Sequence, residues 1–239
     1  MATAAKITAQ EAWTERDSEL PPVREELVHL VEEVAFAARE SDLVDQTSGV
    51  SARMPISALE LLISNLERRA LVHGVESAAP RLCDLFMLLP AITGKVEMVY
   101  EGEQKGVEVV ARQIIGDAVK KLFDKRFPKV ERTLGSGGEE DTGPYAEIVS
   151  WFADGNEVLI SDEQSGDDYR AQLEQVPGLL ELVSAHSGPD DPQPDLFGAE
   201  LLLEGLHQYL KLGREDLDSQ ITYREMIKFQ LLKPRPARA

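Results

Sequence analysis

Apolar side chains recur every three to four residues through most of this chain, which is the spacing of one face of an α-helix. The first such segment runs from Val23 to about Ser41, and charged side chains fill its other face. A second segment runs from Met54 to His73, and Gly74 then supplies a residue type that commonly ends a helix. These patterns predict two helices joined by a loop near the start of the chain.

The remainder of the chain is also predicted to be predominantly helical. Further helical patterns occupy residues 80–92, 103–127, 145–152, 167–185 and 195–212. Proline is expected to end the helix of 103–127 at residue 128 and to interrupt the helix of 167–185 at residue 177. Residues 157–160 favour a strand or an extended segment. The predicted fold class is therefore all-α or nearly so, with an N-terminal helical bundle followed by a second, acidic and predominantly helical region.

Charge divides the chain into two regions. The 239 residues carry a net charge of −18, and residues 139–218 hold 20 acidic and 3 basic side chains, which is nearly all of that charge. A segment with the composition of a flexible linker, residues 135–142, coincides with the change. The expected parts are an irregular leader at 1–21, a helical domain at 22–134, the linker at 135–142, and an acidic helical domain at 143–239 with a frayed tail.

Composition disfavours several classes of function. Cys83 is the single cysteine and the chain has four histidines, which indicates neither a zinc cluster nor another metal site. No apolar run approaches the roughly 20 residues of a membrane helix, and the N-terminus lacks the pattern of a signal sequence, so a cytoplasmic protein without membrane contact is expected. The acidic region would repel nucleic acid and would favour a basic protein partner.

Three partial motifs lack residues that their chemistry requires. Gly94-Lys95 follows an apolar run, but a phosphate loop needs glycine in place of Leu89 and serine or threonine in place of Val96. The segment Gly49–Arg53 ends in arginine where a nucleophile elbow needs glycine. The acidic residues of 162–168 do not follow the order of a calcium loop, and a solvated charged turn is the simpler interpretation.

One stretch carries a more specific pattern. Residues 43–57 contain the sequence Gly-Val-Ser-Ala-Arg at 49–53 and lead into the helical pattern of residues 59–71. This stretch resembles the helical lid of magnesium-chelatase-like and MoxR-like AAA+ ATPases, in which a Gly-x-Ser-x-Arg turn opens a lid helix. Supporting segments follow in the expected order at 65–70, 92–97, 176–179 and 203–207. Together they extend the resemblance over most of residues 23–212, as the lid and C-terminal extension of such an ATPase.

The resemblance implies a role for Arg53 as the sensor-2 residue, which reaches the terminal phosphates of ATP, with Ser51 as a lesser contributor. It also implies ATP and magnesium as cofactors, a ring-shaped oligomer, and an AAA+ core domain or neighbouring subunits as partners. That core should precede the lid, and the roughly forty residues before Leu43 hold no phosphate loop. The chain is therefore not expected to hydrolyse ATP by itself, and no catalytic or metal-binding residue is assigned to it.

A second interpretation stays open. Composition and spacing alone are equally consistent with a helical interaction module that has no enzymatic role, in which the acidic region of residues 139–218 docks a basic partner. The two hypotheses differ in their dependence on salt, since docking through charge weakens as ionic strength rises.

Overall fold

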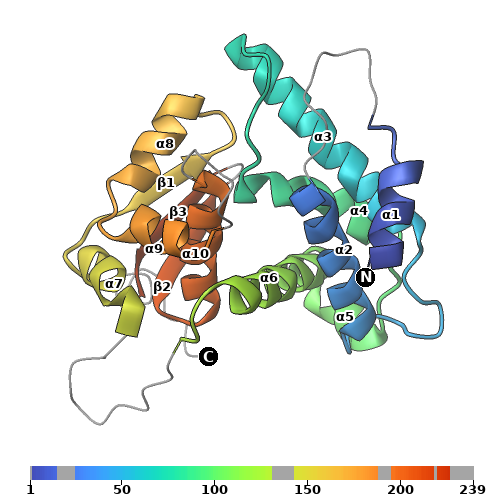
Figure 1. The fold of residues 1–239 in the computed structure, drawn as a ribbon. Helices are drawn as coiled ribbons and strands as arrows, with labels where there is room; N and C mark the ends of the chain where they lie inside the picture. The colour runs from blue at the N-terminus through green and yellow to red at the C-terminus, as the bar shows by residue number, and fades with distance from the viewer. Residues whose placement is uncertain (1, 15–24, 131–142, 188–194, 218–219, 227–239) are drawn as a thin grey trace. The chain divides into compact units, whose positions relative to one another are not determined.

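The computed structural model describes residues 2–14, 25–130, 143–187, 195–217 and 220–226. Within these residues the protein is mostly helical and contains a small antiparallel sheet (Figure 1). The predicted mostly helical fold class is confirmed. The chain divides into two compact units, unit 1 at residues 1–122 and unit 2 at residues 123–239, and the division falls inside helix α6.

Unit 1 is built from helices of very different lengths. They are α1 (Ala2–Glu11), α2 (Glu25–Glu40), α3 (Arg53–His73), the 3₁₀-helix η1 (Leu82–Leu88), α4 (Leu89–Thr93), α5 (Tyr100–Lys105) and most of α6 (Val107–Arg126). Helices α2 and α3 confirm the first two predicted helices. The C-cap of α3 is Gly74, whose φ of +64° is left-handed and whose N–H donates to the carbonyls of Ala70 and Leu71, as expected for a glycine that ends a helix.

Three predictions for unit 1 are wrong in part. The leader was expected to be irregular, but Ala2–Glu11 forms a helix whose buried side chains are alanine and threonine, which left no apolar period to detect. Residues 80–92 form η1 and α4 in place of one helix, and Pro90 stands in the first turn of α4, where a missing N–H is tolerated. The helix expected at 103–127 is broken at Gly106, whose φ of +99° no α-helix contains.

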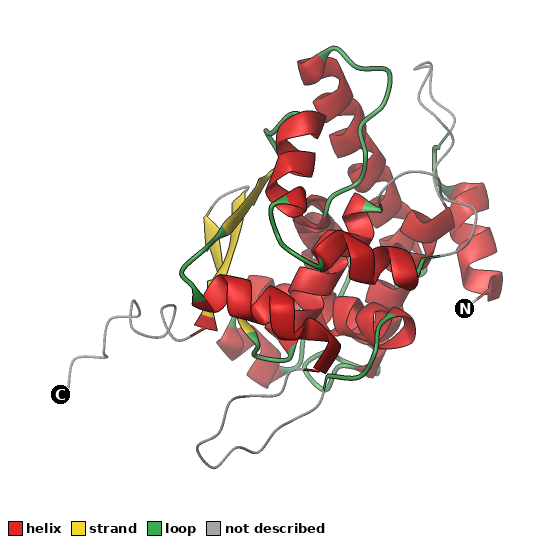
Figure 2. Cartoon of the chain, turned by 60° about the vertical axis from the view of Figure 1, so that its left-hand side comes forward, coloured by secondary structure: helices red, strands yellow, loops and turns green. Residues whose placement is uncertain are grey.

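Unit 2 combines short helices with the sheet, which Figure 2 shows in yellow. Its elements are the end of α6, the 3₁₀-helix η2 (Gly143–Tyr145), α7 (Ala146–Ala153), β1 (Val158–Ser161), α8 (Gly166–Glu174), α9 (Leu179–Ala185), α10 (Leu196–Gln208), β2 (Leu212–Leu217) and β3 (Gln220–Glu225). The strand order is β1-β3-β2, with both neighbouring pairs antiparallel. The predicted strand at 157–160 and the interruption of the helix at 167–185 are confirmed.

The strands β2 and β3 were not predicted. The helical pattern of residues 195–212 ends at Gln208 in the structure, and Leu212 and Gly213 begin β2 instead of closing the helix. Gly213 pairs with Arg224, and Ile221 pairs with both Ile160 and Asp216 in the middle of the sheet. Among the described strands β2 lies at the edge beside β3, and its largely polar sequence lacks the alternation that marks a half-buried strand.

Each unit has its own apolar core. The core of unit 1 includes Leu30, Val31, Val34, Met54, Leu59, Leu62, Leu85, Leu88 and Ile92. The core of unit 2 includes Phe123, Tyr145, Phe152, Val158, Ile160, Leu202, Leu203 and Leu206. Among the described residues, no helix is long and apolar enough to cross a membrane.

Some sequence predictions fall outside the described residues. These are the linker at 135–142, the second half of the leader at 15–21 and the tail after residue 226. The proposed domain boundary at the linker therefore stays a prediction. The compact units themselves divide earlier in the chain, after Leu122, because Phe123 packs with residues of unit 2.

Candidate functional site

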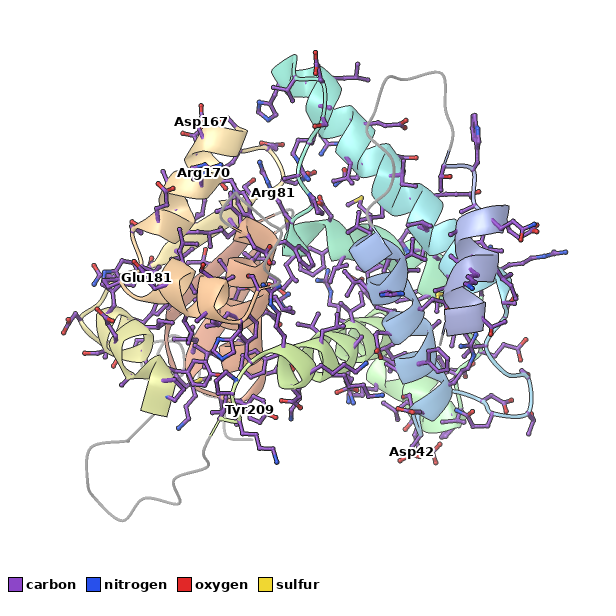
Figure 3. The ribbon with its side chains drawn as sticks, viewed as in Figure 1. Asp42, Arg81, Asp167, Arg170, Glu181 and Tyr209 are labelled. Carbon is purple, nitrogen blue, oxygen red and sulfur yellow. The ribbon has the colours of Figure 1, made fainter. Side chains whose placement is uncertain are left out.

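The loop between α2 and α3 brings the predicted site residues Ser51 and Arg53 to the N-terminus of α3. The loop begins close to Asp42, which is labelled in Figure 3. It reverses direction through Gly49, whose φ is +68°. A residue with a Cβ adopts this left-handed conformation at a cost, so glycine is favoured at this position.

The loop is held by the segment at residues 95–99. Two isolated antiparallel bridges join them: Val44 with Met98, and Val50 with Val96. The hydroxyl of Ser48 also donates to Glu97 Oε2 at 2.5 Å. At the start of α5, a Cβ on Gly102 would come within 2.5 Å of the carbonyl oxygen of Leu43, so the loop backbone lies directly against this glycine. These contacts give the loop a defined path into α3.

Asp45 organises the turn itself. Both the backbone N–H and the hydroxyl of Thr47 donate to Asp45 Oδ1, each at 2.7 Å, and the N–H of Gly49 donates to the carbonyl of Asp45 at 3.1 Å. The hydrogen bond from the Thr47 hydroxyl is the largest of several that hold the pKa of Asp45 below its ordinary value, because such bonds favour the charged carboxylate. The hydrogen bonds of the turn therefore favour the ionised form of Asp45.

Arg53 is the first residue of α3 and its side chain is exposed. Its backbone N–H donates to Ser51 Oγ at 3.2 Å, and the N–H of Met54 donates to the carbonyl of Ser51 at 2.9 Å. Met54 is fully buried and anchors this end of the helix in the core. Ser51 thus accepts two backbone N–H groups at the start of α3, Met54 holds this end of the helix in the core, and the side chain of Arg53 is left exposed to solvent.

The electrostatics of this helix end favour an anion. The aligned peptide dipoles of the 21-residue helix give its N-terminus a partial positive charge, and no acidic residue of the first turn offsets it. Within the described part of the chain, Arg53 takes part in no ion pair. Lys95, also exposed, directly precedes Val96, the bridge partner of Val50. The helix N-terminus, Arg53 and Lys95 would attract a phosphate or a carboxylate, whereas the carboxylates of Asp45 and Glu97 nearby would repel one.

The chemistry of the described residues fits one of the two implied cofactors. The phosphates of ATP match the fork of donors on Arg53. Magnesium would need several oxygen ligands, and no group of three or more His, Cys, Asp or Glu that could hold a metal ion occurs in the described ranges. This applies also to the acidic residues of 162–168, of which Glu163, Asp167 and Asp168 are exposed and Asp162 is buried.

A second polar cluster lies in unit 2 and was missed by the sequence analysis. Glu200 and Glu204 are one turn apart on α10, and both are fully buried. Glu200 Oε2 accepts from the hydroxyl of Tyr169 at 2.9 Å. Glu204 accepts from the hydroxyl of Tyr223 at 2.9 Å and from Nη1 of Arg214 at 2.7 Å. The bonds of Glu204 fasten α10 to β2 and β3, and the bond of Glu200 fastens it to α8.

The signal for this cluster was present in the sequence. Glu200 and Glu204 follow Leu196 at intervals of four, so they continue the same helical face. Carboxylates are assigned to the solvent side by default because their burial is costly without partners. Here the partners come from β2, β3 and α8. Burial first, and then the neighbouring Glu204, raise the pKa of Tyr223 well above its ordinary value, so its hydroxyl remains a donor.

Comparison of the chain with models of protein families, with curated proteins and with solved structures gave no significant match.

Proposed function

We propose that unit 1 acts as the lid of an AAA+-type ATPase of the magnesium-chelatase-like class, with Arg53 as the cation that contacts the terminal phosphates of ATP. The observation that carries the proposal is the exposed guanidinium at the first residue of a long helix whose first turn has no acidic residue. The resemblance of residues 43–57 to the lid turn of these ATPases supplies the identity of the anion.

The role of Arg53 in this proposal is electrostatic. A guanidinium presents several N–H donors in a plane and can bind two phosphate oxygens at once. Charge on those oxygens is redistributed as the terminal phosphoryl group is transferred, so a fixed cation at that place lowers the barrier. Ser51 supports Arg53 by accepting the N–H of its backbone and is not required to touch the nucleotide.

The other parts of the ATPase come from elsewhere in this proposal. A phosphate loop, magnesium ligands and an arginine finger belong to a core domain or to neighbouring subunits in a ring. Magnesium would be held by ATP and by that core. The proposed location is the cytoplasm, where ATP is available.

The first experiment is to read the DNA that precedes this reading frame in all three forward frames. We expect a segment with Gly-x-x-x-x-Gly-Lys-Ser/Thr followed by an acidic strand end. The joined protein, and its Arg53→Ala and Arg53→Lys variants, would then be assayed for magnesium-dependent ATP hydrolysis. Arg170→Ala serves as the matched control, because Arg170 is a partly exposed arginine on α8 (Figure 3).

Loss of one charge-assisted contact to phosphate is expected to lower the rate by about 10- to 100-fold in Arg53→Ala, whereas Arg170→Ala should hydrolyse ATP like the parent. Arg53→Lys should recover part of the rate, since lysine keeps the charge without the planar fork. Full ATPase activity in Arg53→Ala would remove Arg53 from the nucleotide site. Absence of any phosphate loop upstream would instead favour the interpretation of the chain as an interaction module.

A second candidate function has its own observation. Acidic side chains of unit 2 are exposed on several successive elements, namely Glu147, Asp154, Glu157, Glu163, Asp167, Asp168, Glu174, Glu181, Glu215 and Asp216. In Figure 3, Asp167 and Glu181 are labelled on α8 and α9. This acidic surface would dock a basic protein. Capture of such a partner should be lost as salt rises from about 0.05 M to 0.5 M, and persistence at high salt would contradict docking by charge.

A further inference from the structure

Helix α1 contacts the rest of unit 1 through a narrow stripe of short side chains. Ala5 and Thr8 of α1 and Ala12 just after its end, spaced at i, i+3 and i+7, are buried, whereas Ile7 of α1 and Trp13 beyond it are 51% and 65% exposed. Figure 1 shows α1 in dark blue beside α2 and α3, and contacts to both helices are present. An amphipathic core helix would instead turn its largest apolar side chains inward. Helix α1 therefore lies on the unit without building much of its core.

A buried carboxylate stands under the middle of this stripe. Glu32 on α2 is 1% exposed, and the hydroxyl of Thr8 donates to its Oε1 at 2.5 Å. Its second oxygen, Oε2, is also buried and accepts no hydrogen bond from the described residues. A carboxyl group in such a place is unfavourable unless a donor faces it. The surface beneath α1 is therefore expected to bind a helix more favourably when a hydroxyl group stands at the position of Thr8.

The remainder of unit 1 is held together without α1. Helix α2 buries Leu27, Leu30, Val31, Val34 and Ala38, and α3 buries Met54, Leu59, Leu62 and Ile63. Just beyond the C-terminal end of α1, the N–H of Trp13 donates to Glu60 Oε1 at 3.1 Å, and this bond is exposed to solvent. Removal of α1 would thus uncover one face of α2 and α3 while their mutual packing stays in place.

From these contacts we infer that the face of α2 and α3 around Glu32 is a docking surface for a helix, and that α1 is its exchangeable occupant. The occupant has a defined chemistry: three short side chains at i, i+3 and i+7, with a hydroxyl donor on the central one. Release of α1 exposes Glu32 and opens the surface to another helix of the same kind. The inference does not depend on the function proposed for Arg53.

The experiment introduces Thr8→Glu into the full chain, because a second carboxylate cannot share the buried position of Glu32. Hydrogen exchange read by mass spectrometry follows α1, α2 and α3 separately. Protection of residues 2–11 should fall by about tenfold or more, while α2 and α3 keep theirs. Thr3→Glu places the same charge on the exposed side of α1 and should leave its protection unchanged.

A peptide of residues 2–14, labelled with a fluorophore, then tests the vacated surface. The Thr8→Glu chain should bind this peptide, and the unsubstituted chain, whose surface is occupied, should bind it at least about tenfold more weakly. The same peptide with Thr8→Val, which has nearly the same shape but no hydroxyl, should lose most of its affinity for the Thr8→Glu chain.

Three results would overturn the inference: unchanged protection of α1 in Thr8→Glu, joint loss of protection in α1, α2 and α3, or failure of the released chain to bind the peptide. If Thr8→Glu does not fold, Thr8→Val is compared with Thr8→Ser in the same exchange measurement. The valine variant should then lose protection in α1 alone and the serine variant should keep it. Equal protection in these two variants would also contradict the role of the hydroxyl.

Discussion

Arg69 on α3 donates to both carboxylate oxygens of Asp84 in η1, with Nη1 at 2.6 Å from Oδ1 and Nη2 at 2.8 Å from Oδ2. Both side chains are buried, at 2% and 0% exposure. Asp84 also accepts from the side chain of Asn65 at 2.7 Å and from the N–H of Arg81 at 2.7 Å. This carboxylate is therefore the point at which α3, the following loop and η1 are joined.

Asp84→Ala should destabilise unit 1 strongly. It leaves the guanidinium of Arg69 buried without its counter-charge, and the loss of one partner of a buried pair costs about 3–5 kcal/mol in free energy of unfolding. Chemical denaturation followed by circular dichroism would measure the change. Glu108→Ala breaks the exposed pair with Arg112 and should cost less than about 1 kcal/mol. Equal effects of the two substitutions would show that burial of the Arg69 pair contributes nothing.

Gly205→Ala should destabilise unit 2. Gly205 lies inside α10, and a Cβ at this position would overlap the ring of Phe123. Because the core around Phe123 is closely packed, the ring must move, at a cost of about 1–3 kcal/mol that outweighs the gain in helix propensity. Gly166→Ala, at the open start of α8, has no atom within 4 Å of the new methyl group and should be neutral or slightly stabilising. Thermal unfolding of both variants would test the contrast.

The pH dependence of the loop before α3 should follow Asp45. Its hydrogen bonds with Thr47 lower the pKa of Asp45 in the folded state. The stability that these bonds provide is therefore fully present above the unfolded pKa of about 3.9, and it is lost as the pH falls through the lower pKa of the folded state. Carbon NMR of the carboxyl group would locate its titration. Thr47→Val should move the midpoint upward and Thr47→Ser should not. A midpoint at the ordinary value in the unsubstituted chain would contradict the hydrogen bonds.

Arg53→Ala should change the stability of the folded chain by no more than about 0.5 kcal/mol, because the side chain is exposed and its backbone bond to Ser51 survives the substitution. A melting temperature equal to that of the unsubstituted chain is the expected result. Together with a reduced ATPase rate in the joined protein, this outcome would separate a role in nucleotide contact from a role in folding. A large fall in melting temperature would assign Arg53 to the structure instead.

The site and its surroundings were open to prediction to different degrees. The loop that contains Gly49 and the start of α3 near Met54 could be predicted, because a polar segment and the helical period that follows it are local features of the chain. The bridges to Val96 and Met98 could not, because they join residues about fifty positions apart and each is a single pair. The hydrogen bond between Thr8 and Glu32 could not be predicted either, because Thr8 lies on α1, whose sequence has no apolar period.

Leu210 shows the limit of periodicity near a helix end. The spacing of α10 assigned it to the apolar side of the helix with Leu203 and Leu206, yet it lies beyond the helix, is 73% exposed and has a φ of +59°. The N–H of Lys211 donates to the carbonyl of Leu206, which closes the helix at this left-handed residue. Glycine usually takes this place, so the sequence contains no sign of the ending.

By itself, the sequence determined the mostly helical class and the positions of α2 and α3. Each of these follows from interactions within about four residues along the chain. Tertiary structure alone decided the division after Leu122, the pairing of β2 and β3 with β1, and the burial of Glu32, Asp84, Glu200 and Glu204. A carboxylate is buried only where distant donors meet it, and a polar strand is stable only beside another strand, so neither can be read from a local pattern.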